Sequence, residues 1–260
     1  MLLEPNALGL SAIAFVAFSL AASAMYALND VMDVERDRVH PAKRLRPVAS
    51  GEISTQAATT ACVLLVVLSL AAAFLVSGAL VAVLAVYIGV TVTYSMRLKH
   101  VPVLDMVIVA SGFVLRAIAG GAATDVPISS WFLIVTSFGA LFVVAGKRYA
   151  ELTNLSDNGS SHRPSLDNYN PEYLRHVLTL SAGLAAIAYC LWAFEVPREG
   201  LSQLLMQLSI VPFVTALLRY AHIVMQGRGG EPEEVFLRDR ELLVLGATWL
   251  GLFGVGVSLG

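Results

Sequence analysis

The stretch LGLSAIAFVAFSLAASAMYALNDVMDVERD, residues 8–37, joins an apolar run to a cluster of acidic side chains. The run Leu8–Leu28 is long enough to cross a bilayer as a helix. Asp30, Asp33 and Asp37 follow it at spacings of three and four residues, so a continuing helix would place all three carboxylates on one face. Because like charges repel each other there, the pattern favours a bound divalent cation.

Mg²⁺ suits this cluster, since it prefers carboxylate oxygens and usually keeps positions for water and substrate phosphates. Asn29 lies directly beside the acidic residues and would add an amide oxygen. The competing interpretation is a solvated helix end, neutralised by ion pairs with Arg36 and Arg38. The sequence therefore predicts a metal–phosphate site at a membrane surface, with a plain polar helix end as the alternative.

The composition indicates an all-α polytopic membrane protein. Of the 260 residues, 57% are hydrophobic and 14% are charged, with a mean hydropathy of +0.73; soluble domains carry about 25% charged residues. We expect a single domain over residues 1–260, a helical bundle with eight transmembrane helices. Cys62 and Cys190 both fall inside apolar runs and form no disulfide framework. The expected spans are 8–28, 56–77, 79–96, 102–124, 128–146, 174–194, 201–222 and 240–259.

The basic residues lie almost entirely on one side of this predicted topology. All of the 17 Lys and Arg residues except Arg116, inside a span, and Arg198 fall in or beside the loops 29–55, 97–101, 147–173 and 223–239. The positive-inside rule makes that side cytoplasmic. The acidic cluster and the longer loops share this side, so we expect the active site to face the cytoplasm. No feature points to a nucleic-acid partner, and a homo-oligomer is left open.

The pattern Asn-Asp-x-x-Asp-x-x-x-Asp at Asn29–Asp37 resembles the first aspartate-rich motif of the UbiA superfamily of membrane prenyltransferases. The resemblance implies an all-helical membrane fold and Mg²⁺ that holds the diphosphate of a donor. Usual members carry a second motif, Asp-x-x-x-Asp, in a later cytoplasmic loop. Here the equivalent place reads Lys147-Arg148-Tyr149-Ala150-Glu151, which is mostly basic. This departure argues against ordinary prenyl diphosphate chemistry.

Five further strings look closely like the decaprenyl-phosphate phosphoribosyltransferase branch, and the resemblance covers nearly the whole chain. The strings are SLAASA (19–24), HPAKRLRP (40–47), RAIAGG (116–121), AGKRYAEL (145–152) and LWAFE (191–195). The resemblance implies transfer of 5-phosphoribose from phosphoribosyl pyrophosphate to a polyprenyl phosphate such as decaprenyl phosphate. It also implies a multi-pass protein among the lipids of the bacterial inner membrane, working in cell-wall arabinan synthesis.

The expected roles follow from two anionic substrates. Asp30, Asp33 and Asp37, assisted by Asn29, are expected to bind Mg²⁺ directly or through water. Glu151 either orients Lys147 or reaches the ribose hydroxyls. The remaining predicted site residues are phosphate-binding cations: Lys43, Arg44, Arg46, Lys147, Arg148 and, as a weaker candidate, Lys99.

Two rival functions and one departure from the branch stay open. A UbiA-type prenyltransferase with an aromatic acceptor would want the second aspartate-rich loop. A transporter would place its ionisable groups near mid-membrane. Family members usually begin with another cytoplasmic segment and span, giving nine. We therefore expect that this chain, starting at Met1-Leu2-Leu3-Glu4-Pro5, is truncated or begins upstream.

Overall fold

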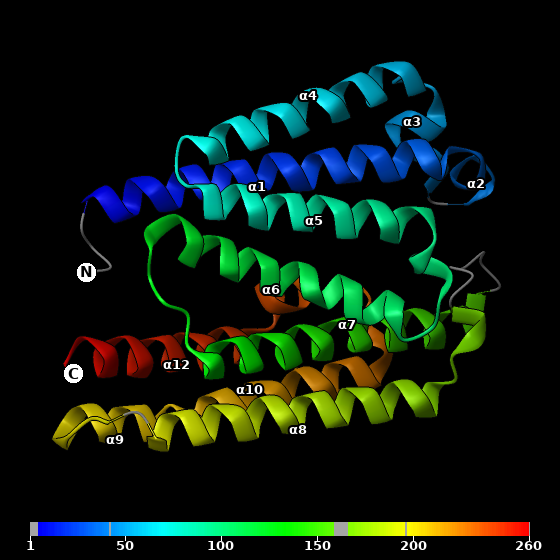
Figure 1. Cartoon of the computed structure of the whole chain (residues 1–260). Coiled ribbons are helices and arrows are strands. Elements are labelled where there is room, and N and C mark those ends of the chain that lie inside the picture. Colours follow the sequence, from blue (N-terminus) through cyan, green and yellow to red (C-terminus); the bar gives the residue numbers. More distant parts are fainter. Residues whose placement is uncertain (1–4, 42, 159–165, 196, 260) are drawn as a thin grey trace. The chain divides into compact units, whose positions relative to one another are not determined.

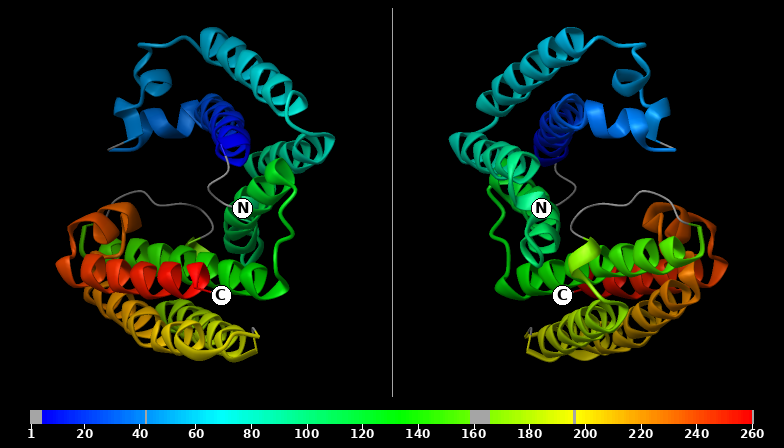
Figure 2. Two further views of the ribbon diagram at one scale, coloured as in Figure 1. Left: turned by 90° about the vertical axis from the view of Figure 1, so that its left-hand side faces the viewer. Right: turned by 90° about the vertical axis from the view of Figure 1, so that its right-hand side faces the viewer.

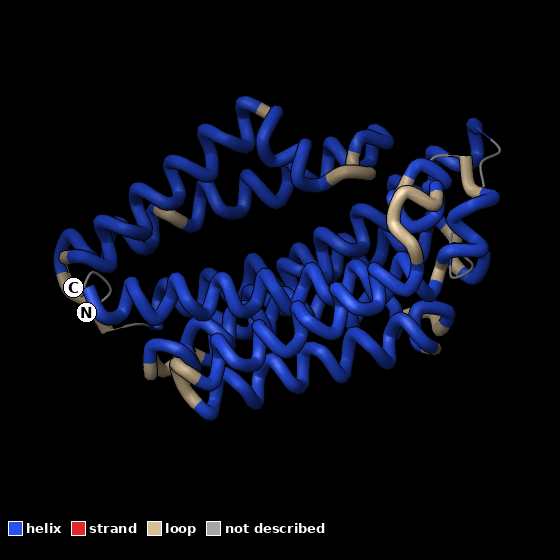
Figure 3. Tube along the Cα trace, turned by 90° about the horizontal axis from the view of Figure 1, so that it is seen from above, coloured by secondary structure: helices blue, strands red, loops and turns tan. Residues whose placement is uncertain are grey.

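The computed structural model describes residues 5–41, 43–158, 166–195 and 197–259, and these residues form helices without strands (Figures 1 and 3). They divide into two compact units, one up to Ile128 and one from Ser129 onward. Eight segments are long and apolar enough to cross a membrane, as expected from the sequence. The single-domain expectation stays a prediction, and each unit is described by itself.

The first unit contains four long helices and four short ones. Its long helices are α1 (Pro5–Met32), α4 (Thr55–Phe74), α5 (Gly78–Met96) and α6 (Leu104–Thr124). Its short elements are α2 (Val34–Val39), η1 (Lys43–Leu45), α3 (Pro47–Ser50) and η2 (Leu98–His100). α1 packs against α4, α5 and α6, so it forms the centre of this unit (Figure 2).

Small residues explain this central position of α1. Ala14, Ala17 and Ala21 are buried on one face of α1 together with Phe18, and the three small side chains let neighbouring helix backbones approach closely. Ser69 of α4 donates a 2.7 Å hydrogen bond to the carbonyl of Ala17 in this apolar interior. Because α1 is fixed along its length, its acidic C-terminal end has a defined position in the unit.

The second unit is built from α7 (Ser130–Asn158), α8 (Pro171–Glu195) and the helices that follow them. α7 packs against α8, while α12 packs against α9 and α10. The other elements are η3 (Leu166–Asn168), α9 (Gly200–Leu208), α10 (Ile210–Ile223), the π-helical turn η4 (Val224–Arg228), α11 (Pro232–Arg238) and α12 (Arg240–Ser258).

The predicted span 201–222 lies within one segment that is long and apolar enough to cross a membrane, Gly200–Arg228, in which α9 and α10 meet at Ser209 with right-handed helical backbone angles (φ −65°, ψ −17°). Pro212 has no N–H and is therefore tolerated only near the start of α10. The buried Ser209 hydroxyl donates to the carbonyl of Met206 at 2.6 Å and is 2.7 Å from the Tyr189 hydroxyl. The indole N–H of Trp249 donates to the Tyr189 hydroxyl at 2.8 Å. Side chains and backbone of three helices thus satisfy the polar groups at the junction of α9 and α10.

Asp239 holds the start of α12 in two ways. Its carboxylate accepts from the backbone N–H of Leu242 at 3.0 Å and from Arg219 of α10 at 2.8 and 3.3 Å. The hydrogen bonds from Arg219 lower the pKa of Asp239, and the Leu242 N–H lowers it further. The negative charge is therefore retained well into the acidic range, and it joins the ends of two helices.

We expect Asp239→Ala to lower the free energy of unfolding by about 1 kcal/mol, the usual effect of losing an N-cap. Asp239→Asn should lose less, because the amide oxygen still caps the helix. Since the folded pKa is depressed, the ion-pair contribution is present above the unfolded value near 3.9 and disappears as the pH falls through the folded value. Thermal unfolding in detergent at several pH values measures this; equal melting temperatures for all three proteins would contradict it.

Candidate functional site

The acidic segment lies at the junction of α1 and α2. Asp30 is in the last turn of α1, Asp33 is the residue between the helices, and Asp37 is on α2. Asp33 has φ −99° and ψ 4°, outside the helical region, yet its N–H still donates to the carbonyl of Asn29 at 2.9 Å. The expected single helix face is therefore interrupted by a bend at Asp33, which is a correction.

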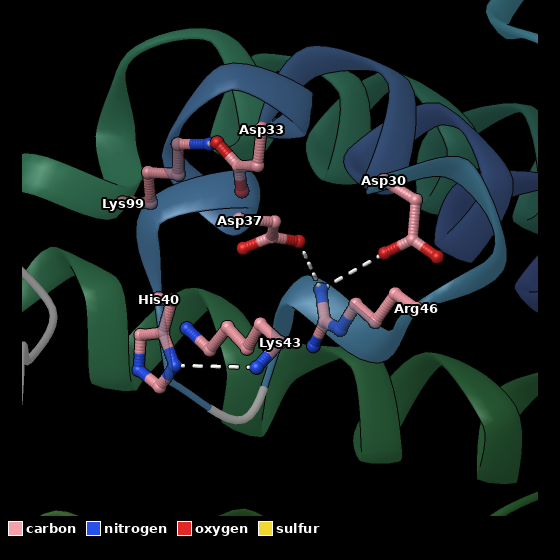
Figure 4. A network of polar contacts seen from close by, with 7 residues as sticks. All are labelled: Asp30, Asp33, Asp37, His40, Lys43, Arg46 and Lys99. Carbon is pink, nitrogen blue, oxygen red and sulfur yellow. Dashed lines mark hydrogen bonds and ion pairs between the residues drawn. The ribbon is translucent and has the colours of Figure 1, made fainter. Parts of the chain in front are cut away.

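Arg46 binds two of the three carboxylates. It precedes α3, and its Nη1 lies 2.9 Å from Asp30 Oδ1 and 2.9 Å from Asp37 Oδ2 (Figure 4). The Asp37 side chain is only 6% exposed, so this charge would be costly without its partner. The sequence predicted Arg46 as a phosphate ligand; the structure places it as the counter-ion of the acidic pair.

Lys99 binds the third carboxylate from a distant part of the chain. Its Nζ lies 2.5 Å from Asp33 Oδ1, and the two side chains are 14% and 20% exposed. Lys99 belongs to η2, which packs against both α5 and α6. The weaker sequence candidate is therefore in direct contact with the acidic cluster.

His100 and Arg36 extend this cluster of charges. Arg36 Nη1 is 3.4 Å from His100 Nε2. Burial lowers the pKa of His100, and the Arg36 and Lys99 cations lower it further. His100 is therefore uncharged at neutral pH. The charges that balance the aspartates come from Arg46 and Lys99.

The remaining predicted residues of this unit lie near the acidic cluster. The backbone N–H of Lys43 donates to His40 Nδ1 at 3.2 Å, and both side chains lie beside the aspartates (Figure 4). Arg44 is exposed and Asn29 is half-buried. These positions leave Lys43 and Arg44 at the same polar end as the aspartates, where a phosphate group could meet them.

The donor set fits Mg²⁺ in its chemistry, because three carboxylates lie within one short segment. Among the described residues, no three His, Cys, Asp or Glu side chains are grouped closely enough to hold a metal ion. The aspartates instead turn toward Arg46 and Lys99 (Figure 4). Metal binding therefore requires these acidic side chains to move closer together.

The second predicted group is on a helix of the second unit. α7 continues to Asn158, well past the expected end at residue 146, so Lys147, Arg148 and Glu151 are helical; the expected loop start at 147 is corrected. Arg148 donates to Glu151 at 3.0 Å and its side chain is 3% exposed. Glu151 is thus oriented toward Arg148.

Lys147 has a different partner, which sequence reasoning missed. Its Nζ is 3.4 Å from Glu231 Oε2, with side chains 31% and 64% exposed. Glu231 follows a tight turn in which Gly227 has φ 78°. A Cβ at Gly229 would lie 2.6 Å from a methyl carbon of Val224. The glycine cluster 227–230 was the available signal for such a turn, although it gives no direction for Glu231.

Comparison with known proteins gives consistent results along the chain. A model described as the UbiA prenyltransferase family matches residues 3–252. The chain is 48% identical over 247 residues to a protein named decaprenyl-phosphate phosphoribosyltransferase from Mycobacterium tuberculosis, covering 95% of this chain and 81% of that relative. A Corynebacterium glutamicum protein of the same name is 45% identical, with 92% of this chain and 73% of the relative covered.

Solved structures agree in fold. A UbiA homologue from Archaeoglobus fulgidus bound to GPP and Mg²⁺ has a TM-score of 0.73 at 18% identity, covering 96% of this chain and 87% of that chain. An apo UbiA homologue from Aeropyrum pernix has a TM-score of 0.64 at 15% identity, and the match covers 98% of this chain and 90% of that chain. The all-helical fold expected from the sequence is confirmed.

Proposed function

The chain belongs to the UbiA prenyltransferase family and is a multi-pass membrane protein, and from this premise we propose that it is a phosphoribosyltransferase. It transfers 5-phosphoribose from phosphoribosyl pyrophosphate to a polyprenyl phosphate such as decaprenyl phosphate, and releases pyrophosphate. The proposal is supported by relatives of that name at 45% to 48% identity over more than nine-tenths of the chain. The product would serve cell-wall arabinan synthesis.

The observation that carries the proposal is the unequal charge of the two polar helix ends. The α1–α2 junction supplies three carboxylates, whereas α7 supplies Lys147 and Arg148 where usual members would have a second acidic motif. One acidic cluster suits one diphosphate. A basic helix end suits a monophosphate, which both a lipid phosphate and the ribose 5-phosphate provide.

The reaction needs little from a general base. A lipid phosphate oxygen is ionised near neutral pH, and it attacks the anomeric carbon of the ribose while the bond to pyrophosphate breaks. The electron pair of that bond leaves with pyrophosphate, and the ribose passes through an oxocarbenium-like state. Positioning of the two anions and stabilisation of the leaving charge therefore account for most of the rate.

The residues have separate roles in this scheme. Asp30, Asp33 and Asp37, assisted by Asn29, would hold a divalent cation, and Mg²⁺ there would neutralise charge on the leaving pyrophosphate. Lys43, Arg44, Arg46 and Lys99 bind diphosphate oxygens. Lys147 binds a monophosphate, and the buried Arg148 is held by Glu151.

The proposed setting is the bacterial inner membrane with the polar helix ends toward the cytoplasm. This orientation is supported by the distribution of Lys and Arg along the chain. It gives the water-soluble donor access from the cytoplasm, while the acceptor lipid reaches the protein within the membrane.

Donor recognition tests this function without following the reaction. We expect phosphoribosyl pyrophosphate with Mg²⁺ to raise the melting temperature of the detergent-purified protein; a ligand at 100 times its Kd adds about 2.7 kcal/mol. Geranyl diphosphate with Mg²⁺ should have a clearly smaller effect. Tryptophan fluorescence during heating gives the readout, and each donor without Mg²⁺ is the control. A larger shift with geranyl diphosphate would favour the prenyltransferase alternative.

A further inference from the structure

The acidic cluster is already neutralised in large part by the chain itself. Arg46 bridges Asp30 and Asp37, and Lys99 pairs with Asp33, so these five side chains alone carry a net charge of −1, and the Lys43 side chain adds a further cation beside them (Figure 4). Both cations come from outside the acidic segment, one before α3 and one from η2. One oxygen of each of the three carboxylates that would bind a metal therefore already accepts a hydrogen bond from Arg46 or Lys99.

The burial of these groups makes the pairs consequential. The side chains of Asp37, Asp33 and Lys99 are 6%, 20% and 14% exposed, so water screens their charges only in part. A nearby pair, Arg38 with Glu35, is also 2.9 Å long but is 50% and 81% exposed. Such a surface pair contributes little to stability. Because it lies on α2, the helix that carries Asp37, it provides a comparison for the buried pairs.

A metal ion alone meets opposition at this cluster. Two positive charges added to a group of net charge −1 create an excess of +1, and the ion must approach two fixed cations at short range. A diphosphate removes this excess and gives Arg46 and Lys99 new oxygen partners as the aspartates turn to the metal. The metal and the diphosphate are then favoured together more than either is favoured alone.

We infer that Arg46 and Lys99 are positioning residues that make divalent-cation binding conditional on the diphosphate substrate. In the absence of substrate they occupy the aspartates, and in its presence they move to the diphosphate. The coupling is reciprocal, so the diphosphate also binds weakly without the metal. This inference rests on the proposed metal site, and it holds for any diphosphate donor.

Two titrations test the inference, because the affinities for the metal ion alone and for pyrophosphate should change in opposite directions when Arg46 or Lys99 is replaced. For Arg46→Gln and Lys99→Gln we expect the affinity for Mn²⁺ alone to rise about tenfold, measured as free Mn²⁺ by electron paramagnetic resonance. Binding of radiolabelled pyrophosphate at saturating Mg²⁺ should fall by about tenfold or more. Arg38→Gln, the control for loss of one positive charge, should change both affinities less than twofold.

A structural role alone would give a different result. Misfolding or loosening of the cluster would weaken the binding of both Mn²⁺ and pyrophosphate. Either that outcome or an unchanged Mn²⁺ affinity would overturn the inference. So would a native protein that binds Mn²⁺ alone as tightly as Arg46→Gln does. Neither titration involves ribose transfer or a lipid, so failure of the proposed function and failure of this coupling are distinguishable.

Discussion

Asp33→Asn is expected to lower the rate of ribose transfer to the lipid by about 10²–10³-fold, the usual effect of losing one group that stabilises charge in the transition state. Asp33 lies at the bend between α1 and α2, in the centre of the acidic segment. An amide has nearly the same shape but no negative charge, so the loss would reflect charge rather than size. Initial rates with purified protein at saturating substrates provide the measurement.

The control for Asp33→Asn also changes Lys99, the ion-pair partner of Asp33. Lys99 is only 14% exposed, so removal of the carboxylate leaves a largely buried ammonium group unpaired. The double variant Asp33→Asn with Lys99→Gln removes that charge, and it should recover melting temperature without recovering activity. If the double variant is as active as Lys99→Gln alone, Asp33 serves only to neutralise Lys99, and its assignment to the metal site is wrong.

Lys147→Gln is expected to lower kcat/KM by about 10- to 100-fold, corresponding to about 1.5–3 kcal/mol for a hydrogen bond to a charged group. Lys147 is 31% exposed and its ion-pair partner Glu231 is 64% exposed, so it can exchange that partner for a phosphate. Steady-state kinetics with each substrate varied in turn would show whether donor or lipid is affected.

Glu231→Gln is the matched control for Lys147. It breaks the same ion pair but keeps the positive charge, so kcat/KM should stay the same or rise. Equal losses in Lys147→Gln and Glu231→Gln would mean that the ion pair itself is required, as a structural link between α7 and the segment before α11. That result would contradict a phosphate-binding role for Lys147.

Hydropathy was sufficient for the membrane helices but not for the polar contacts between them. All eight expected spans correspond to helical segments, because helix formation satisfies every backbone group in lipid. The polar contacts at Ser209, where α9 meets α10, were not predicted. The polar groups there are satisfied by Tyr189 and Trp249, which are distant in sequence, and hydropathy averaged over a window does not register such contacts.

The polar residues of the site could be predicted by type and spacing, but their partners could not. The acidic segment and the basic residues near it were identified from the sequence. The Lys99–Asp33 pair joins residues 66 positions apart, and it depends on how α1, α5 and η2 pack. Glu231 likewise reaches Lys147 only because of the turn at Gly227. Such pairings arise from tertiary packing, which spacing along the chain does not encode.

Transfer of label from a doubly labelled donor tests the central claim most directly. Phosphoribosyl pyrophosphate would carry ¹⁴C in the ribose and ³²P in the terminal phosphate of the pyrophosphate group, and it would be given to the membrane-embedded protein with polyprenyl phosphate and Mg²⁺. The account predicts ¹⁴C in the lipid phase and ³²P in the aqueous phase as pyrophosphate, with no transfer when polyprenyl phosphate is omitted. Absence of ¹⁴C from the lipid, together with consumption of a prenyl diphosphate in a parallel reaction with an aromatic acceptor, would contradict it.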